Sequence, residues 1–337
     1  MRSRSAIQLG GPVLLVVLAA LLGSFASTAT EIYFVSALVS VTIVVALYVF
    51  VGNSGVVSFG HISFVAVGAW AAGVLSVPAE EKPATMPNLA GFLRDTTVGN
   101  LPSLAIAAAV GGVFALVAGL ALMRLSGLAA GIATFAVLEI TNNVLRYTDK
   151  VGPGLNVFSS VPETTGLLQA TVGAVLVVTA AFVYQRSRFG RQLRAARDDP
   201  AAARAVGISV YRQRLVAFAI SGVLAGFGGG LYVHLLPTGA DSLYLDLTFI
   251  TLAMLVIGGM TSLWGAVVGA LFVSGLDSVL GEMEDGMTVF GRTIDLPSGS
   301  RINVVSAVMA LVLIVRPSGL TGGREFSLGR LRAVTAR

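Results

Sequence analysis

Glu139 and Asn143 are residues whose types and spacing offer chemistry inside an apolar stretch. They stand four positions apart, so on a helix both side chains lie on one face. A carboxyl group inside a bilayer costs about 2.5–3.5 kcal/mol on insertion scales, so it must face a protein interior, a partner or a cavity. The pair is therefore a candidate contact for an ammonium-bearing solute that crosses a membrane. A structural hydrogen bond between helices is the alternative.

Ser58 and His61 belong to a second polar group, in the glycine-rich segment 52–70. Non-helical backbone at membrane depth occurs where it is buried in protein or lines a cavity, and broken helices often line solute pathways. We take both residues as candidates for a translocation pathway. The alternative is a packing face of small residues, with Ser and His hydrogen-bonded to neighbouring helices. For the glycine clusters in 221–232 and 258–270, close helix packing is the favoured interpretation.

Several kinds of chemistry are excluded by the residue counts. The chain has no Cys and two His, which excludes disulfides, thiolate nucleophiles and a His-rich metal site. Its two lysines, Lys82 and Lys150, follow acidic residues, so neither completes the Gly-Lys-Ser/Thr of a nucleotide-binding P-loop. We expect no catalytic, cofactor-binding or metal-binding residue. If this protein moves a solute against its gradient, a partner protein must supply the energy.

The elements that position these residues are membrane-spanning helices. Of the 337 residues, 55% are hydrophobic and 12% charged, and the mean hydropathy is +0.86. About 20 apolar residues cross a bilayer as a helix. Ten stretches approach this length, the eighth and tenth being short: 12–29, 32–51, 55–77, 101–123, 126–145, 167–184, 215–235, 247–261, 264–280 and 302–316. The predicted fold class is an all-α integral membrane protein.

Charge supports ten crossings with both termini in the cytoplasm. In that topology 16 of the 22 basic residues face the cytoplasm, and 12 of the 17 acidic residues lie outside. This is the distribution that the positive-inside rule predicts. Arg2 and Arg4 precede the first apolar run as in a signal peptide. We interpret that run as a retained first span, because a second follows at once, and a cleaved signal is the alternative.

One large loop, residues 185–214, carries eight Arg and two Asp. Its centre predicts a short helix: Pro200 suits the first turn, Asp198 or Asp199 can cap it, and Gly207 ends it. Arginines that anchor spans and contact anionic lipid are one interpretation of the loop. A capped, alanine-rich helix without a row of large apolar residues favours docking into a groove of another protein instead.

Six sets of motifs occur in an order that resembles a known family: Ser58–Phe64 with Gly68–Trp70, Leu125–Gly127 with Ala133–Glu139, Gly190–Arg197 with Ala203–Gly207, Ala217–Gly226, Gly258–Met260 with Trp264, Gly265, Gly269 and Ala270, and Arg316–Leu320. Together they resemble the inner-membrane permease of bacterial branched-chain amino acid ABC importers, of the LivM type. The resemblance covers about residues 32–322. Each motif alone is weakly specific, and the six in order are quite specific.

The resemblance implies an ABC importer permease bundle in the bacterial inner membrane, in contact with lipid. The implied partners are a second homologous permease subunit, two ATP-binding cassette ATPases and an extracytoplasmic solute-binding protein, with no cofactor and no nucleic acid. The loop from Gly190 to Gly207 is similar to the part that meets the ATPases. Its candidate coupling residues are Arg191, Arg194, Arg197, Asp198, Pro200, Arg204 and Gly207.

The expected organisation is a permease domain over 1–322, with the coupling loop 185–214, and a basic cytoplasmic tail over 323–337. The expected solutes are branched-chain or related amino acids. The loop 148–155 departs from the family pattern, and related permeases move urea, short amides or sugars, so these solutes are alternatives. An ion-coupled secondary carrier, a membrane enzyme and a non-transporting scaffold are rival functions. The sequence lacks the dense set of intramembrane titratable residues that such an enzyme needs.

Overall fold

The computed structural model of the chain describes residues 2–284, 286–289, 292–294, 297 and 299–326. Within these residues eight helices are long and apolar enough to cross a membrane. They are α1 (Arg2–Ser24), α2 (Thr28–Ser54), α6 (Asn100–Leu122), α7 (Gly127–Tyr147), α8 (Leu167–Arg186), α11 (Val210–Val233), α12 (Leu245–Gly258), with the 3-10 turn η1 (Asp241–Leu243) before it, and α13 (Leu263–Glu284). Two shorter apolar helices are α3 (His61–Ser76) and α14 (Ser300–Val315).

Each of the ten stretches expected from the sequence therefore overlaps one of these ten apolar helices over most of its length. The third differs most, because residues 55–60 are not helical and α3 begins only at His61. The fourteenth helix has 16 residues, in agreement with a short tenth stretch. A small antiparallel hairpin, β1 (Met287–Val289) and β2 (Arg292–Ile294), lies between α13 and α14.

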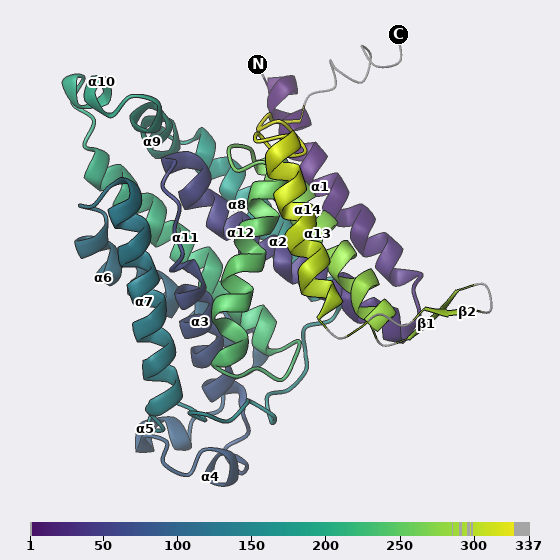
Figure 1. Cartoon of the computed structure of the whole chain (residues 1–337). Helices are drawn as coiled ribbons and strands as arrows, with labels where there is room; N and C mark the ends of the chain where they lie inside the picture. The colour runs from purple at the N-terminus through teal and green to yellow at the C-terminus, as the bar shows by residue number, and fades with distance from the viewer. Residues whose placement is uncertain (1, 285, 290–291, 295–296, 298, 327–337) are drawn as a thin grey trace.

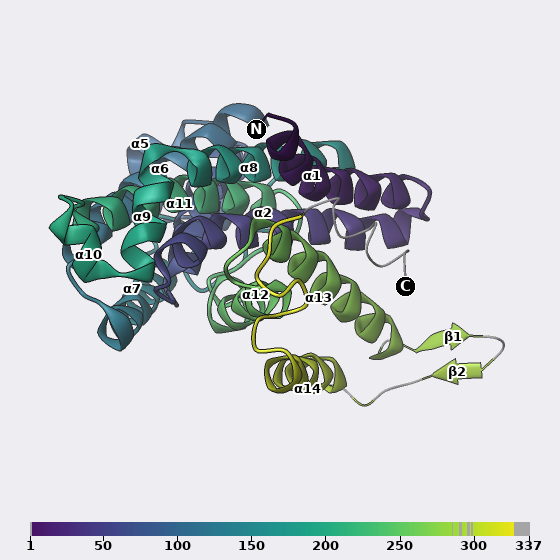
Figure 2. The same ribbon diagram turned by 90° about the horizontal axis from the view of Figure 1, so that it is seen from above.

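Short helices mark the two ends of the bundle (Figure 1). One end carries α9 (Arg188–Asp198) and α10 (Pro200–Ala205), and we call it the α9–α10 end. The opposite end carries α4 (Lys82–Thr85) and α5 (Gly91–Arg94), and we call it the α4–α5 end. A shallow cavity of about 280 Å³ lies at this second end, between segments 85–88 and 149–156. Viewed from above, α14 and the hairpin lie at the side away from α6 and α8 (Figure 2).

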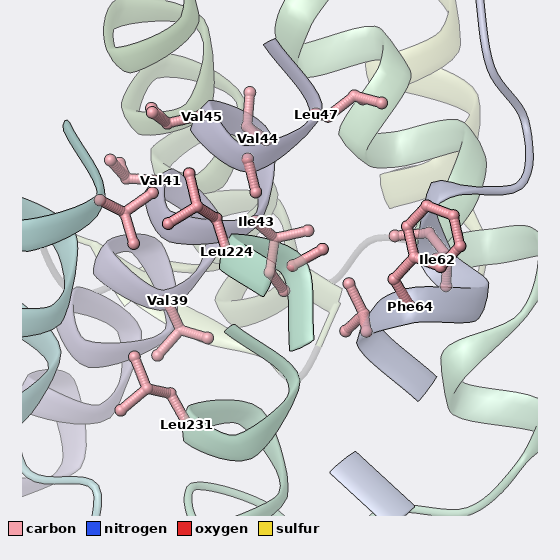
Figure 3. Packing of buried hydrophobic residues seen from close by; sticks show 14 of the residues in the cluster. Val39, Val41, Ile43, Val44, Val45, Leu47, Ile62, Phe64, Leu224 and Leu231 are labelled. Carbon is pink, nitrogen blue, oxygen red and sulfur yellow. The ribbon is translucent and has the colours of Figure 1, made fainter. Parts of the chain in front are cut away.

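Helix α2 forms the centre of the bundle. From Val41 to Ser54 every side chain is buried, and α8, α11 and α13 pack around the helix. A helix that is apolar on all sides is surrounded by protein or by lipid, and over these turns α2 is surrounded by protein. Figure 3 shows its valines, among them Val39 and Val44, against Leu224 and Leu231 of α11.

Glycine packs α11 tightly against α3 and α6. A Cβ on Gly68 of α3 would overlap the backbone of Gly226, and one on Gly111 of α6 would lie 2.7 Å from the carbonyl oxygen of Gly222. Small residues of this kind let helix backbones approach closely in membranes. Because α11 runs unbroken through its glycine cluster, the packing interpretation is correct for 221–232.

Candidate coupling surface and transport face

Local sequence rules build the two helices of the α9–α10 end. The Ser187 side chain accepts a hydrogen bond from the Gly190 amide at 3.2 Å and begins α9. The Asp199 carboxyl group accepts bonds from the Ala201 and Ala202 amides at 2.8 and 3.0 Å and begins α10. Pro200 occupies its first turn, and Gly207 follows it with a φ of 81°. The expected helix is confirmed, and of the two expected capping residues Asp199 is the one used.

Helix α9 was not foreseen as a separate element. Gly190, Leu193 and Ala196 form its buried face, and their spacing of three is a helical signal that the many arginines obscured. A Cβ on Gly190 would overlap the Tyr184 carbonyl oxygen at the end of α8. The buried face therefore seats α9 directly on the bundle and turns its polar face outward.

The candidate coupling residues divide into an outward and an inward group. Arg191, Asp198, Pro200, Arg204 and Gly207 are exposed. Beside them Val206 leaves 76% of its surface exposed, so the tip of α10 is apolar as well as basic.

Arg194 and Arg197 point inward. The first donates to the carbonyl oxygen of Gln185 at 2.6 Å, and the second donates to that of Gly52 at 2.7 Å. Arg197 also donates to Asp198 at 3.2 Å. The two inward arginines fix α9 to α8 and α2. Of the outward residues, Asp198 is paired with Arg197, and Arg191 and Arg204 are exposed.

Glu139 and Asn143 lie on an exposed face of α7 that we call the transport face. The Asn143 Nδ2 atom donates to Glu139 Oε1 at 3.0 Å, and the Tyr244 hydroxyl donates to Glu139 Oε2. Two neutral donors thus orient the carboxyl group, which keeps further acceptor positions open to a third group.

Polar contacts continue from the transport face toward the α4–α5 end. Arg146 forms an ion pair with Asp241 at 2.8 Å, and Asn142 Nδ2 donates to the Ala240 carbonyl oxygen at 3.0 Å. An exposed acidic side chain in the middle of a span is costly against lipid. The transport face is therefore a surface that requires cover by protein or water.

Ser58 and His61 lie in the packed interior. The two ring nitrogens of His61 lie 2.7 Å from Ser58 Oγ and 2.8 Å from Ser221 Oγ of α11. The ring stacks on Phe50 with centroids 5.4 Å apart, and Phe218 meets it edge-on at 5.3 Å. The structure does not bring Ser58 and His61 together with Glu139 and Asn143. Their hydrogen bonds to each other and to α11 match the packing alternative, in which Ser and His bond to neighbouring helices.

The family of the chain follows from its sequence match. A model of the branched-chain amino acid transport system permease component matches residues 29–315. The chain belongs to this family. It is a multi-pass membrane protein of the cell membrane, from a family of transport permeases rather than enzymes.

Relatives of this permease differ in the solutes that their names give. The chain is 27% identical to a probable branched-chain amino acid permease, LivH, of Methanocaldococcus jannaschii, over 47% of this chain and 48% of the relative. It is 26% identical to LivM of Salmonella typhimurium, over 81% and 65%, and 30% identical to the guanosine permease NupQ of Bacillus subtilis, over 66% and 73%. The chain thus spans about half the length of the LivH relative. No solved structure matches it.

Two polar groups of the permease were missed by the sequence analysis. At the α4–α5 end His234 is buried among Ser76, Ser103 and the Pro162 carbonyl oxygen. No local pattern marks this group, because its members lie up to 158 residues apart.

The second missed group is the segment after α14. Its Leu320 and Thr321 amides donate to the carbonyl oxygens of Ile257 and Gly258, at the turn between α12 and α13. Glu325 meets the beginning of α13, and Phe326 lies against Trp264 with ring centroids 4.8 Å apart. Residues 323–326 of the expected tail therefore pack on the bundle, and 327–337 lie outside the described residues.

Proposed function

We propose that this chain is the membrane-spanning subunit of an ATP-driven importer. Its partners are two ATP-binding cassette ATPases, a second homologous permease and an extracytoplasmic binding protein. The observation that carries the proposal is the α9–α10 surface: a helix pair seated on the bundle, with Arg191 exposed on α9 and with Arg204 and Val206 exposed at the end of α10. Such a surface fits a groove on a soluble partner. Because the sequence has no P-loop to bind ATP, the energy for transport must come from that partner.

The α9–α10 end faces the cytoplasm in this proposal. The eight arginines between 186 and 214 support that orientation by the positive-inside rule. The start of α1 lies at the same end of the bundle in Figure 1. The α4–α5 end, with its shallow cavity, then faces the binding protein.

The solute passes between the transport face of α7 and the second permease. Glu139 and Asn143 contact the solute, and the partner supplies the cover that their exposure requires. Ser58 and His61 act beside the pathway by holding the turn before α3 to α11. Movement of the ATPases switches the face from outward to inward access.

Branched-chain or related amino acids are the proposed solutes. The family model and the LivH and LivM relatives support them, and the Glu139 carboxyl group is suited to an ammonium group. The NupQ relative and a xylose permease relative of Haemophilus influenzae make nucleosides and sugars the alternatives. Uptake of labelled leucine, guanosine and xylose by the reconstituted importer separates them. Uptake of guanosine or xylose without leucine contradicts the amino acid assignment.

Charge reversal on the exposed arginines of α9 and α10 tests the function. We expect Arg191→Glu with Arg204→Glu to abolish co-purification of the ATPases and ATP-driven uptake, with insertion of the chain unchanged. Arg212→Glu, on an exposed arginine at the start of α11, is the matched control. Full uptake by the double variant contradicts docking at α9–α10. Uptake by the chain alone, driven by an ion gradient, supports the secondary carrier instead.

A further inference from the structure

Arg197 joins α9 to the end of α2. Its Nη1 atom donates to the carbonyl oxygen of Gly52 at 2.7 Å. Gly52 lies in the last turn of α2, where carbonyl groups have no partner within the helix and where a guanidinium meets the negative end of the helix dipole. The aliphatic part of the side chain lies over Gly55, since a Cβ there would be 2.7 Å from Arg197 Cγ.

Residues 55–60, which we call the α2–α3 turn, connect this contact to α7. Gly55 has a φ of 70°, which lets the chain leave the helix. The Phe59 amide donates to Thr134 Oγ1 of α7 at 3.2 Å. Gly60 allows close approach, because a Cβ there would overlap the Thr134 carbonyl oxygen. The turn therefore bears directly on the first half of α7.

Helix α7 connects the α2–α3 turn to the transport face, because Thr134 and Glu139 lie on the same helix. Glu139 follows Thr134 by five residues, which is about one and a half helical turns. A helix moves as a stiff rod over that length, so a displacement at Thr134 displaces Glu139. The other side of the α2–α3 turn is held to α11 by His61 and Ser221, 2.8 Å apart, which confines the direction in which the turn can move.

We propose that Arg197 is a positioning residue that transmits displacement of α9 to α7, through the α2–α3 turn and Thr134. The inference rests on the proposed docking of ATPases at α9–α10 and adds the internal connection that the docking requires. Arg194 has a different role, because its contact at Gln185 lies on α8, directly before α9 in the chain. Arg197 acts without touching the solute.

Two spin labels measure the proposed displacement. The chain has no Cys, so Ile140→Cys on α7 and Leu176→Cys on α8 provide unique labelling sites at side chains 63% and 52% exposed. In the importer with its ATPases, we expect ATP to shift the distance between the labels. Arg197→Met removes the guanidinium group that bonds Gly52 and keeps an aliphatic side chain. Thr134→Val removes the hydroxyl that accepts the hydrogen bond from the Phe59 amide.

Each variant is expected to abolish the ATP-dependent shift and to lower solute uptake per ATP about tenfold, while the ATPases still co-purify. Matched controls are Arg212→Met, on an exposed arginine, and Thr171→Val, whose hydroxyl bonds its own helix at Leu167. Both controls are expected to keep the shift. Because the two positions act in series, the double variant is expected to be no worse than the worse single variant.

Three results overturn the inference. In the first, the ATP-dependent shift persists in Arg197→Met and Thr134→Val. In the second, the losses of uptake per ATP add in the double variant. In the third, the ATPases no longer co-purify with Arg197→Met, which shows that Arg197 acts in docking. A wild-type chain that binds no ATPase overturns the proposed function itself. If the wild-type chain binds the ATPases and both variants keep the ATP-dependent shift, only the connection through Arg197 is overturned.

Discussion

The Glu325 carboxyl group accepts a hydrogen bond from the Leu263 amide at 3.1 Å, across 62 residues of sequence. Its second oxygen lies 3.4 Å from the Trp264 amide. The first amides of a helix have no partner within the helix. The Ser262 hydroxyl accepts from the Gly265 amide at 2.9 Å, and Glu325 adds acceptors for the two preceding amides, so local and distant side chains cap α13 together. The segment after α14 thereby completes the fold at the α9–α10 end.

Removing the Glu325 part of this cap is expected to destabilise the chain, even though the Ser262 bond remains. Glu325→Ala should lower the free energy of unfolding by about 0.5–2 kcal/mol, the usual cost of a lost helix cap, and Glu325→Gln should cost less because an amide oxygen still accepts. Thermal unfolding in detergent measures the change. Arg324→Ala, on the exposed neighbour, is the control. Equal melting temperatures for Glu325→Ala and the wild type contradict the capping role.

Close packing of α11 predicts contrasting effects for two glycines. Gly226→Ala should destabilise the bundle by about 1–3 kcal/mol, because its Cβ would overlap the Ala107 carbonyl oxygen of α6. Gly275→Ala in α13 is the matched helical control, since no atom lies within 4 Å of its Cβ position. The yield of folded chain after detergent extraction and its melting temperature test both. A tolerated Gly226→Ala would show that α6 and α11 can separate without cost.

Features set by a few neighbouring residues could be predicted from the sequence. The ten apolar stretches follow from the length of chain that crosses a bilayer. Helix α10 follows from Asp199, Pro200 and Gly207, which act within one or two turns of backbone. The pairing of Glu139 with Asn143 follows from helical spacing alone.

Contacts between distant segments could not be predicted from the sequence. Whether a polar side chain faces a pathway or the interior depends on which helix covers it, and the covering residue of His61 is Ser221, 160 positions away. Tyr244 likewise reaches Glu139 across 105 positions. Glu325 was assigned to a tail because nothing near it in sequence shows that the Leu263 amide is its partner.

The orientation of Glu139 by Tyr244 predicts a specific effect on transport. Tyr244→Phe removes the hydroxyl that donates to Glu139 Oε2 and leaves the ring. A single hydrogen bond contributes about 0.5–1.5 kcal/mol, so the solute concentration for half-maximal uptake should rise roughly two- to tenfold. Tyr33→Phe in α2 is the control. An unchanged half-maximal concentration would show that the carboxyl group does not depend on this bond.

The buried His234 predicts that the permease loses stability in mild acid. Its Nδ1 atom lies 3.0 Å from the Pro162 carbonyl oxygen and so carries the hydrogen, which leaves Nε2 as the acceptor beside Ser103 and Ser76. Burial lowers the pKa of His234 below its ordinary value, although the bond to Pro162 opposes that shift. The folded chain therefore binds fewer protons here than the unfolded chain in the range just below about pH 6.5.

The free energy of unfolding should accordingly fall as the pH drops below about 6.5, by up to about 1.4 kcal/mol for each unit by which the pKa is lowered. Unfolding measured between pH 7.5 and roughly pH 5.5 avoids most carboxyl titration. His234→Gln removes the titrating group, and its stability should depend less on pH than that of the wild type over the same range. The other histidine, His61, is present in both proteins, so it cancels from the comparison. Parallel pH profiles for the two proteins would show that His234 titrates alike in the folded and unfolded chains.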